Sequence, residues 1–404
     1  MIPLPCFSRR CGPDVIARTA IAVLLAGTMS ASLANTGSNG QPPYRFDFGN
    51  GPVEPSFIGV RARDAYTPER QYGFTTPENM ADVSASGSGV GSDAVRFLQF
   101  GTKSGNTFNV DLKPGLYRVS VTLGNTSRAS VAAEGVYQVL NMTGNNATDT
   151  FEMPVTDGQL NLLITEGKAG TPFTLSALEI KRISRDPTMG PTIWVGGDST
   201  VANYYPLASS VQGGWGQLLP DYIDSHDFQV RNIATGGQIA RGFRDDGQLE
   251  TIVKYSKEGD LFLLEMGIND TAAKNATTEV QFKEIMRDMV RQVAATGATP
   301  ILVTPQGRAT DFNGSGVHSS VNRWYRHATL ALAQEENVPL VDLNVLASAY
   351  FTQIGPAATL ALYMAGDTLH PNRAGAAELA RLVAEDLERQ QIWPLPAQPG
   401  RAGK

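Results

Sequence analysis

In the second half of the chain, short apolar segments alternate with amphipathic ones, and this alternation restricts the fold more than any other feature. The clearest amphipathic segment, residues 282–293, has apolar side chains at helical spacing, and another helix is predicted after Pro371. Strands joined by helical crossovers predict a parallel sheet covered on both sides, with a ligand site at the carboxyl ends of its strands. Five segments are predicted as buried strands: 192–195, 228–232, 260–266, 300–304 and 339–342.

The preceding region has a different pattern, made of short strand-like segments separated by turns such as Lys113-Pro114-Gly115. No convincing helix interrupts this series, which predicts an antiparallel, all-β sandwich of jelly-roll type. The predicted strands are 44–48, 95–100, 108–112, 117–123, 150–155, 159–165 and 173–182.

The first 34 residues have the composition of an export signal, with Arg9, Arg10 and Arg18 before an apolar run and cleavage expected after Ala34. A membrane anchor is the alternative, but the apolar run is shorter than the ~20 residues that span a bilayer. We therefore expect a secreted or periplasmic protein without stable membrane insertion after cleavage. The predicted organisation is a signal peptide (1–34), a tether (35–43), the β-sandwich (44–183), a linker (184–190), the α/β domain (191–392) and a disordered tail (393–404).

Composition restricts the partners that the protein can bind. A formal charge of -6 and a pI near 5.4 disfavour a nucleic-acid partner, because such a surface repels phosphate. Both cysteines, Cys6 and Cys11, lie in the predicted signal, so we expect no disulfide and no cysteine-ligated metal in the mature protein. No cofactor and no metal are expected, and the sequence leaves the oligomeric state open.

Four polar clusters lie where a doubly wound sheet would bring them together: 196–200, 232–237, 267–270 and 367–370. The first three follow predicted strands directly, and the fourth precedes the last predicted helix. Because the carboxyl ends of parallel strands meet at one edge, we expect all four clusters to reach the same site.

These clusters contain the groups that ester hydrolysis requires. Ser199 can act as the nucleophile, His370 as its base, and Asp367 as the group that orients the histidine. If a helix begins at about Thr200, its free backbone N–H groups and positive dipole end would favour negative charge beside the serine.

The oxyanion of such a reaction needs two or three hydrogen-bond donors. The available donors are the Ser199 N–H, a glycine N–H in the 235–237 segment and the Asn269 side-chain amide.

Each cluster also has a purely structural interpretation. Gly197-Asp198-Ser199 can be a turn or a helix cap, and the Asn269-Asp270 pair can cap the element that follows it. Asp367 and His370 can be a capping pair before Pro371. The order and spacing of all four clusters favour catalysis.

The remaining histidines, His226, His318 and His327, are predicted to be solvated.

With these four blocks, the sequence resembles the SGNH or GDSL hydrolase superfamily over roughly residues 192–387. The resemblance implies a flavodoxin-like, doubly wound domain in which Ser199, His370 and Asp367 are catalytic. It also implies an oxyanion hole made by Ser199, Gly237 and Asn269, with Gly236 as the alternative to Gly237.

Within this superfamily the sequence is most similar to the rhamnogalacturonan acetylesterases. The similarity rests on Gly197-Asp198-Ser199-Thr200, on Gly213-Gly214-Trp215-Gly216-Gln217 and on Gly267-Ile268-Asn269-Asp270. One departure is Gly236-Gly237-Gln238-Ile239, where those enzymes often have Ala-Gly-Arg-Ser. The β-rich region, with Phe46-Asp47-Phe48-Gly49 and Tyr72-Gly73-Phe74, resembles a galactose-binding-like domain.

The resemblance implies a secreted serine esterase that removes O-acetyl groups from plant cell-wall polysaccharide, with acetylated rhamnogalacturonan (pectin) as the leading substrate. An acetylxylan esterase is an alternative. A GDSL lipase or thioesterase is another, with an acyl pocket around Tyr204-Tyr205-Pro206 and Tyr350-Phe351.

Two alternatives come from other functional classes. One is a metal-dependent phosphoesterase, and the other is a carbohydrate-binding protein with an inactive hydrolase domain. The β-sandwich can either bind sugar through Tyr66 or Tyr72 or brace the catalytic domain.

Overall fold

The structure is a computed structural model that describes residues 43–83, 91–97, 107–165, 174–185, 191–224, 228–275 and 277–392. These residues belong to one compact unit. The predicted signal, most of the tether, linker residues 186–190, His226 and the tail lie outside the described residues, so these predictions stay untested. None of the helices in the described ranges combines the length and apolar character needed to cross a bilayer.

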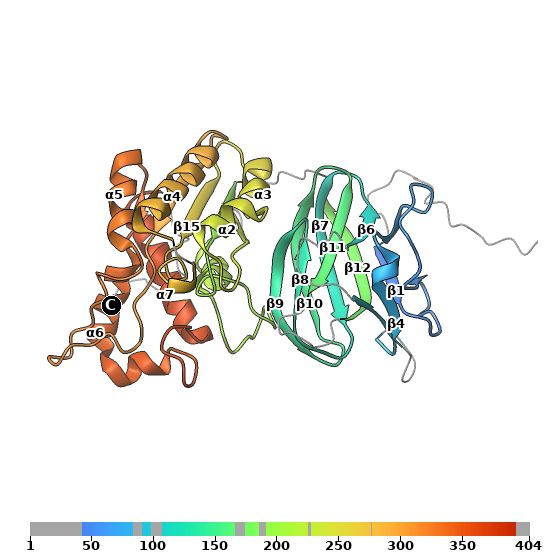
Figure 1. Cartoon of the computed structure of the whole chain (residues 1–404), viewed down its shortest axis with the longest axis horizontal. Helices are drawn as coiled ribbons and strands as arrows, with labels where there is room; N and C mark the ends of the chain where they lie inside the picture. Colours follow the sequence, from blue (N-terminus) through green and yellow to red (C-terminus); the bar gives the residue numbers. More distant parts are fainter. Residues whose placement is uncertain are drawn as a thin grey trace, which may run out of the picture. The chain divides into compact units, whose positions relative to one another are not determined.

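The N-terminal region is a β-sandwich of two facing sheets (Figure 1). The first has the order β10-β7-β12-β1-β2, with β5 also pairing β12 and β4 pairing β5; the second has the order β3-β6-β11-β8-β9. The first sheet contains β1 (Tyr44–Phe48), β2 (Ile58–Val60), β4 (Met80–Val83), β5 (Ala94–Phe97), β7 (Gly115–Leu123), β10 (Thr148–Val155) and β12 (Thr174–Ser184). The second contains β3 (Tyr72–Phe74), β6 (Phe108–Asp111), β8 (Thr126–Ala133), β9 (Val136–Gly144) and β11 (Gln159–Thr165).

The sandwich prediction is confirmed, although five strands were not predicted and one pairing differs. Strands β2, β3 and β4 have only three or four residues each, too few to show alternation. Strands β8 and β9 are rich in small and polar residues and are interrupted by register shifts. Strand β1 pairs β2 in parallel, so the first sheet is not wholly antiparallel.

The C-terminal region contains a five-stranded parallel sheet with the order β14-β13-β15-β16-β17. This is the flavodoxin-like order, and it confirms the predicted fold class. Each strand lies within two residues of its predicted bounds: β13 (Thr192–Gly196), β14 (Gln229–Asn232), β15 (Leu261–Glu265), β16 (Thr299–Val303) and β17 (Leu340–Val341).

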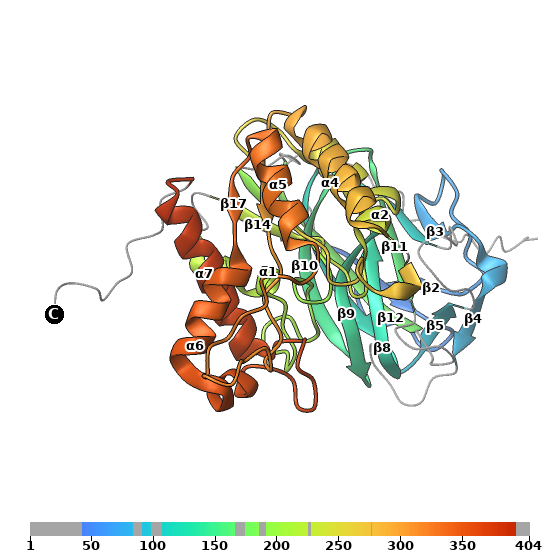
Figure 2. The same ribbon diagram turned by 60° about the vertical axis from the view of Figure 1, so that its left-hand side comes forward.

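Alternate residues of these strands pack into two separate cores, as expected for a sheet covered on both faces. Ile193 and Leu263 contact one core, while Trp194 and Phe262 contact the other. Figure 2 shows helices on both sides of the sheet. The first core includes α1 (Trp215–Leu218), α6 (Leu343–Ala361) and α7 (Arg373–Arg389). The second includes α2 (Ala240–Asp245), α3 (Gln248–Tyr255), α4 (Glu279–Ala294) and α5 (Arg326–Glu336). Single 3-10 turns lie at Pro77–Asn79, Leu219–Tyr222 and Ala273–Asn275.

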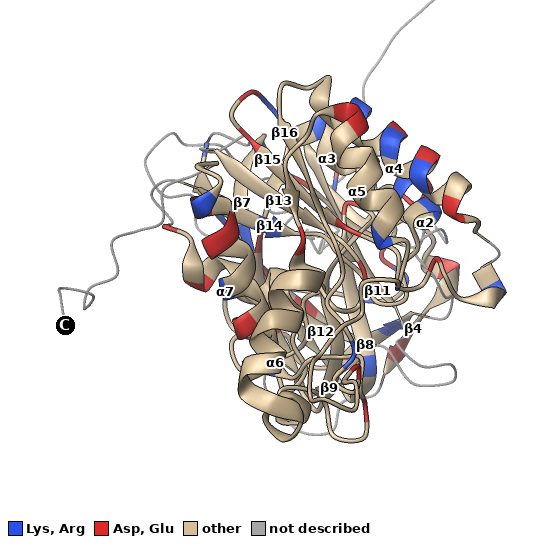
Figure 3. Cartoon of the chain, turned by 90° about the vertical axis from the view of Figure 1, so that its left-hand side faces the viewer, with Lys and Arg blue, Asp and Glu red and all other residues tan. Residues whose placement is uncertain are grey.

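The outer face of α4 is charged, with acidic and basic residues interspersed along it in Figure 3. Arg287 of α4 bonds to Glu335 of α5 (2.6 Å), and Arg291 bonds to Glu336 (2.8 Å). These exposed ion pairs stabilise the helix pair only weakly, since water and salt screen them. The predicted apolar face of α4 is confirmed on the opposite side of the helix, where it packs into the core.

The sandwich joins the α/β region through its edge strand β9. The Leu140 N–H donates to the Asn203 carbonyl (3.1 Å), and the Tyr205 N–H donates back to the Leu140 carbonyl (2.9 Å). The Leu140 side chain is buried in the α/β core, while Tyr205 and Leu207 pack against the sandwich core. The loop that follows residue 199 is therefore bound to β9 through a single parallel β-bridge at Tyr204.

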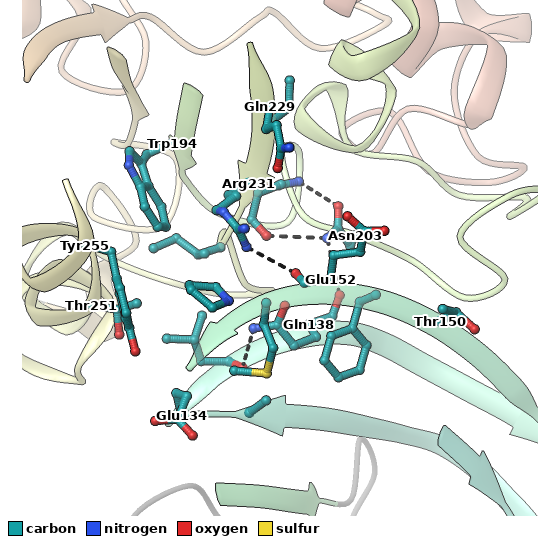
Figure 4. Close-up of a pocket in the computed structure, with 18 residues that line it drawn as sticks. Glu134, Gln138, Thr150, Glu152, Trp194, Asn203, Gln229, Arg231, Thr251 and Tyr255 are labelled. Carbon is teal, nitrogen blue, oxygen red and sulfur yellow. Dashed lines mark hydrogen bonds between the residues drawn. The ribbon is translucent and has the colours of Figure 1, made fainter. Parts of the chain in front are cut away.

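A cavity of about 290 Å³ lies behind this junction (Figure 4). Arg231 donates from Nη1 to the Glu152 carbonyl (3.2 Å), and Asn203 donates from Nδ2 to the Gln138 carbonyl (3.2 Å). Burial lowers the pKa of Arg231 to about 10, so its guanidinium remains charged at neutral pH. These polar contacts tie β14 and the loop at Asn203 to the sandwich.

Candidate active site

The structure brings Ser199, His370 and Asp367 together in one hydrogen-bonded line. Ser199 Oγ lies 2.9 Å from His370 Nε2, and His370 Nδ1 lies 2.7 Å from Asp367 Oδ2. All three residues are partly buried. The serine follows β13, and the histidine precedes α7, so two distant segments meet as the sheet topology predicts.

The segment after Ser199 is a turn, so the condition of a helix beginning at Thr200 is not met. The N–H groups of Val201 and Ala202 both donate to the Asp198 carbonyl (3.1 Å each), but no further helical bond follows. The chain instead extends to pair with Leu140 of β9, and the first helix after this turn is α1. A β-sheet contact from the sandwich thus takes the place of such a helix.

The loop that carries His370 is shaped by the carboxylate that orients the imidazole. Asp367 Oδ1 accepts from the N–H of Leu369 (2.7 Å) and of His370 (3.1 Å), while Oδ2 accepts from the imidazole. Burial raises the pKa of Asp367, but these donors and His370 outweigh it and lower the pKa overall. Asp367 is therefore ionised at neutral pH and holds Nε2 toward the serine.

Asn269 and Gly237 also reach this site. The Asn269 amide donates from Nδ2 to Asp198 Oδ2 (3.2 Å) and to the Gln238 carbonyl (3.0 Å). Both of its hydrogens are thus engaged, and donation to an oxyanion requires one of them to be shared. Gly237 lines the cleft with φ of 74°, a conformation that favours glycine, whereas Gly236 has no positive φ.

Asp270 does not cap the segment that follows it. Its Oδ1 accepts from the Ala240 N–H (3.0 Å), so it binds the first residue of α2, which lies earlier in the chain. Burial raises the pKa of Asp270 to about 6.

Two buried carboxyls, Asp198 and Glu265, contact Thr200, the residue after Ser199, and neither was predicted from the sequence to have a role. Thr200 Oγ1 lies 3.0 Å from Asp198 Oδ1 and 2.7 Å from Glu265 Oε1. One hydroxyl has one hydrogen and can donate to only one of these oxygens, so the other carboxyl must carry a proton.

Glu265 is the carboxyl that keeps the proton. Burial raises the pKa of both groups, and the negative charge of Asp198 raises that of Glu265 further. Asp198 receives two additional donors, the Thr200 N–H (2.9 Å) and the Asn269 amide, which favour its ionised form. Glu265 therefore donates to Thr200, and Thr200 donates to Asp198.

The glycine-rich 213–217 segment packs against the serine turn. A Cβ on Gly214 would lie 2.2 Å from the Val201 carbonyl carbon, so only glycine permits this approach. Trp215 is fully buried and donates from Nε1 to Glu265 Oε2 (2.8 Å). This segment therefore supports the turn that follows Ser199. Two sequence signals could have revealed this support. One is the charged Glu265 at the end of an otherwise apolar strand, and the other is Trp215 between two glycines.

Two of the remaining histidine predictions can be compared with the structure. His318 is only 3% exposed, and its ring contacts Ser348 Oγ (2.9 Å) and the Arg308 carbonyl (2.8 Å), so the prediction that it is solvated is wrong. The burial is possible because both ring nitrogens have hydrogen-bond partners. The sequence around His318 has no apolar periodicity that would have predicted it. His327 is exposed, as predicted. Within the described ranges, no three His, Cys, Asp or Glu side chains lie close enough together to hold a metal ion.

Three of the aromatic residues considered as a sugar platform or acyl pocket have packing or hydrogen-bond contacts within the protein. Tyr72 packs against Phe46 in the sandwich, with ring centroids 5.1 Å apart. Phe351 is 1% exposed and lies in the α/β core. Tyr204 does line the cleft, but its hydroxyl donates to the Ser199 carbonyl (2.7 Å).

Ser199 opens into a cleft of about 750 Å³ whose walls come from both regions of the chain. Leu140 is the only aliphatic side chain larger than alanine among the described residues that line it. Seven lining residues belong to the sandwich: Arg128, Ser130, Gly135, Tyr137, Leu140, Asn141 and Thr165. The others include Ser199, Tyr204, Gln212, Thr235, Gly236, Gly237, Gln238, Asp246, Gln248, Asn269, Asp367 and His370.

Comparison with known proteins identifies the family. Residues 195–378 match the GDSL-like lipase/acylhydrolase family. The chain is 70% identical over 349 residues to the uncharacterized esterase YxiM of Bacillus subtilis (strain 168), covering 86% of this chain and 91% of that protein. The chain belongs to the GDSL-like lipase/acylhydrolase family. It is an esterase of this family, as the sequence resemblance predicted.

Further comparisons agree on the fold of both regions. Residues 44–181 match a galactose-binding-like domain described as β-agarase/YXIM esterase-like. The crystal structure of YxiM from Bacillus subtilis has a TM-score of 0.79 at 69% identity and covers 87% of this chain and 99% of that one. The probable rhamnogalacturonan acetylesterase YesY of Bacillus subtilis (strain 168) is 34% identical over 209 residues, covering 50% of this chain and 94% of that protein.

Proposed function

We propose that this esterase removes O-acetyl groups from plant cell-wall polysaccharide, with acetylated rhamnogalacturonan as the leading substrate and acetylated xylan as the next. The observation that carries this proposal is the line Ser199–His370–Asp367 at the base of a polar cleft. A long acyl chain would need an apolar channel, whereas the cleft offers amides and hydroxyls suited to a sugar. The similarity to a probable rhamnogalacturonan acetylesterase supports the same substrate class.

In the first half of the reaction, Ser199 Oγ attacks the acetyl carbonyl carbon while His370 Nε2 takes the hydroxyl proton. The carbonyl π electrons move to oxygen, and the Ser199 and Gly237 N–H groups with the Asn269 amide stabilise the resulting oxyanion. His370 then gives its proton to the sugar oxygen, the carbon–oxygen bond to the sugar breaks, and an acetyl-enzyme remains. Asp367 stabilises the imidazolium that exists between these two proton transfers.

In the second half, a water molecule attacks the acetyl-enzyme and passes a proton to His370. The tetrahedral intermediate collapses, Ser199 leaves with that proton, and acetate is released. The buried pair Asp198 and Glu265 takes no part in these transfers; Asp198 positions the Asn269 amide.

The test is acetate release from acetylated rhamnogalacturonan, acetylated xylan and 4-nitrophenyl acetate by the wild type and by Ser199→Ala. Ser209→Ala, an exposed serine in a nearby loop, is the matched control. We expect the S199A variant to lose activity by at least ~10³-fold on every substrate, because the nucleophile is gone. Equal release by wild type and S199A would overturn the mechanism, and wild-type release from neither polysaccharide would overturn the proposed substrate.

We also propose that residues 1–34 direct export and are removed after Ala34. The support is the basic start and apolar run of this segment. Mass spectrometry of the protein recovered outside the cytoplasm should find a mature N-terminus at Asn35. Recovery of the whole chain from the cytoplasm alone would contradict export.

A further inference from the structure

The sandwich contributes an unusual pair of residues to the wall of the cleft. Arg128 of β8 and Asn141 of β9 both line the cavity that contains Ser199. Arg128 has a φ of 56°, which a residue with a long side chain rarely adopts, whereas the φ of 63° at Asn141 is one that asparagine tolerates. Strain of this kind persists only where surrounding contacts enforce it, and it is concentrated at functional sites.

The register of the two strands explains how this strain arises. The pairing of β8 with β9 shifts between Thr126 and Ala129, so Arg128 lies in a β-bulge. Bulges next to active sites re-aim a side chain relative to the pleat. The Arg128 N–H donates to Thr143 Oγ1 (2.9 Å), and its Nε donates to Asn141 Oδ1 (3.5 Å). The bulge therefore holds this arginine in the cleft wall through contacts of its own backbone and side chain.

The charge of Arg128 is not neutralised by the protein. Among the residues that the structure describes, no carboxylate forms an ion pair with it, and it is the only Lys or Arg that lines the cleft. Its side chain is exposed to solvent. The other charged lining residues are Asp246 and Asp367, with His370 beside the latter. A negatively charged group entering the cleft therefore has one cationic partner.

Arg128, Tyr204 and Ser199 line the same cleft of about 750 Å³. The Tyr204 hydroxyl donates to the carbonyl of Ser199 (2.7 Å). A group bound at Arg128 thus lies in the same cleft as an acetyl group at Ser199, and both groups can belong to one sugar chain.

We propose that Arg128, supported by Asn141, forms a subsite that binds the carboxylate of a uronic acid residue in the acetylated polysaccharide. The guanidinium has a planar set of donors that matches a carboxylate, and Arg is the residue best suited to such recognition. This inference rests on the proposed acetylesterase function and narrows its substrate to an acidic polysaccharide. It also makes the sandwich part of the substrate site, in addition to its contacts with the serine loop.

The experiment compares two acetylated galacturonate-containing oligosaccharides, one with free carboxylates and one with methyl-esterified carboxyls. Wild type should have a higher kcat/KM on the free acid. Arg128→Gln should lower kcat/KM on the free acid by about 10- to 100-fold, the usual effect of losing a charge-assisted bond, and should remove the preference. Hydrolysis of 4-nitrophenyl acetate should remain within about twofold, because that ester has no carboxylate.

Arg96→Gln is the matched control, since Arg96 is an exposed arginine on β5 in the other sheet of the sandwich. It should leave all three rates unchanged. A thermal unfolding midpoint of R128Q equal to that of the wild type shows that the variant is folded. If R128Q keeps the wild-type preference for the free acid, the subsite is overturned.

A second readout separates this proposal from the proposed function. Unacetylated oligogalacturonate should inhibit 4-nitrophenyl acetate hydrolysis competitively in the wild type, and R128Q should weaken that inhibition by a similar factor. This measurement needs no polysaccharide turnover, so it reports on the subsite even if no polysaccharide is deacetylated. Equal inhibition of wild type and R128Q, or equal inhibition by a neutral xylo-oligosaccharide, would contradict a carboxylate subsite.

Discussion

Replacing Glu265 by Gln tests the conclusion that this buried side chain is a neutral acid in contact with Thr200, the residue after Ser199. Glutamine has nearly the same shape, and its amide can donate to Thr200 while its oxygen accepts from Trp215, as the protonated acid does. The E265Q variant should therefore fold normally and keep most of its esterase activity at neutral pH. The two proteins should differ in how their stability responds to pH.

The magnitude follows from the raised pKa. Burial and the charge of Asp198 raise the pKa of Glu265 from 4.5 to about 8. Below pH 4.5 the side chain is protonated in the folded and unfolded states, and its full contribution to stability is present. As the pH rises from 4.5 to about 8, the unfolded chain releases this proton first and the contribution is lost. At about 1.4 kcal/mol per pH unit, the total loss is roughly 5 kcal/mol.

A loss of this size is a large share of the 5–15 kcal/mol that stabilises a typical domain. E265Q has no proton to lose, so its unfolding free energy should exceed that of the wild type by an amount that grows with pH. Denaturant unfolding, followed by tryptophan fluorescence from about pH 5 to about pH 9, measures this difference. Glu258→Gln, at an exposed glutamate, should show the wild-type pH dependence. A difference between E265Q and wild type that stays constant with pH would refute the protonated Glu265.

Two further substitutions test the site and its support. Asp367→Asn should lower kcat on 4-nitrophenyl acetate by about 10³- to 10⁴-fold, because the imidazolium loses its counter-charge. The unfolding midpoint should not change. A variant that retains a tenth of the activity would contradict the role of Asp367. Gly214→Ala should destabilise the protein by about 1–3 kcal/mol in denaturant unfolding, because the new Cβ meets the Val201 backbone. The control is Gly314→Ala, because a Cβ at that position meets nothing within 4 Å. If the two variants are equally stable, the 213–217 segment accommodates the added methyl group without loss of stability.

The sequence was sufficient to predict the α/β region because its signals are local. Strand β15 is a continuous apolar run, and α4 has apolar residues at regular helical spacing. Strands β8 and β9 were missed for the opposite reason: bulges and small residues such as Ala132 and Ala133 interrupt their alternation. The bulge that hides β8 from pattern analysis is also the feature that places Arg128 in the cleft.

At the site, the residues that meet at the sheet edge were predictable, and those that support them were not. Ser199, Asn269 and His370 belong to short polar blocks whose order is informative. The extended chain after the Ser199 turn could not be predicted, because its contact with Leu140 comes from a residue about 60 positions away. Such long-range pairing overrides local propensity, and no local pattern reports it.

The backbone pairing of β9 with the serine loop has a consequence for recombination between relatives. Exchanging the N-terminal region at a crossover near residue 186 would replace the strand that carries Leu140 and, with it, the support of the loop that follows the nucleophile. The same exchange would replace the cleft wall at Arg128 and Tyr137. A chimera of this family therefore takes its substrate cleft from both parents. Its activity depends on whether the β9 strand of one parent pairs with the loop after Ser199 of the other.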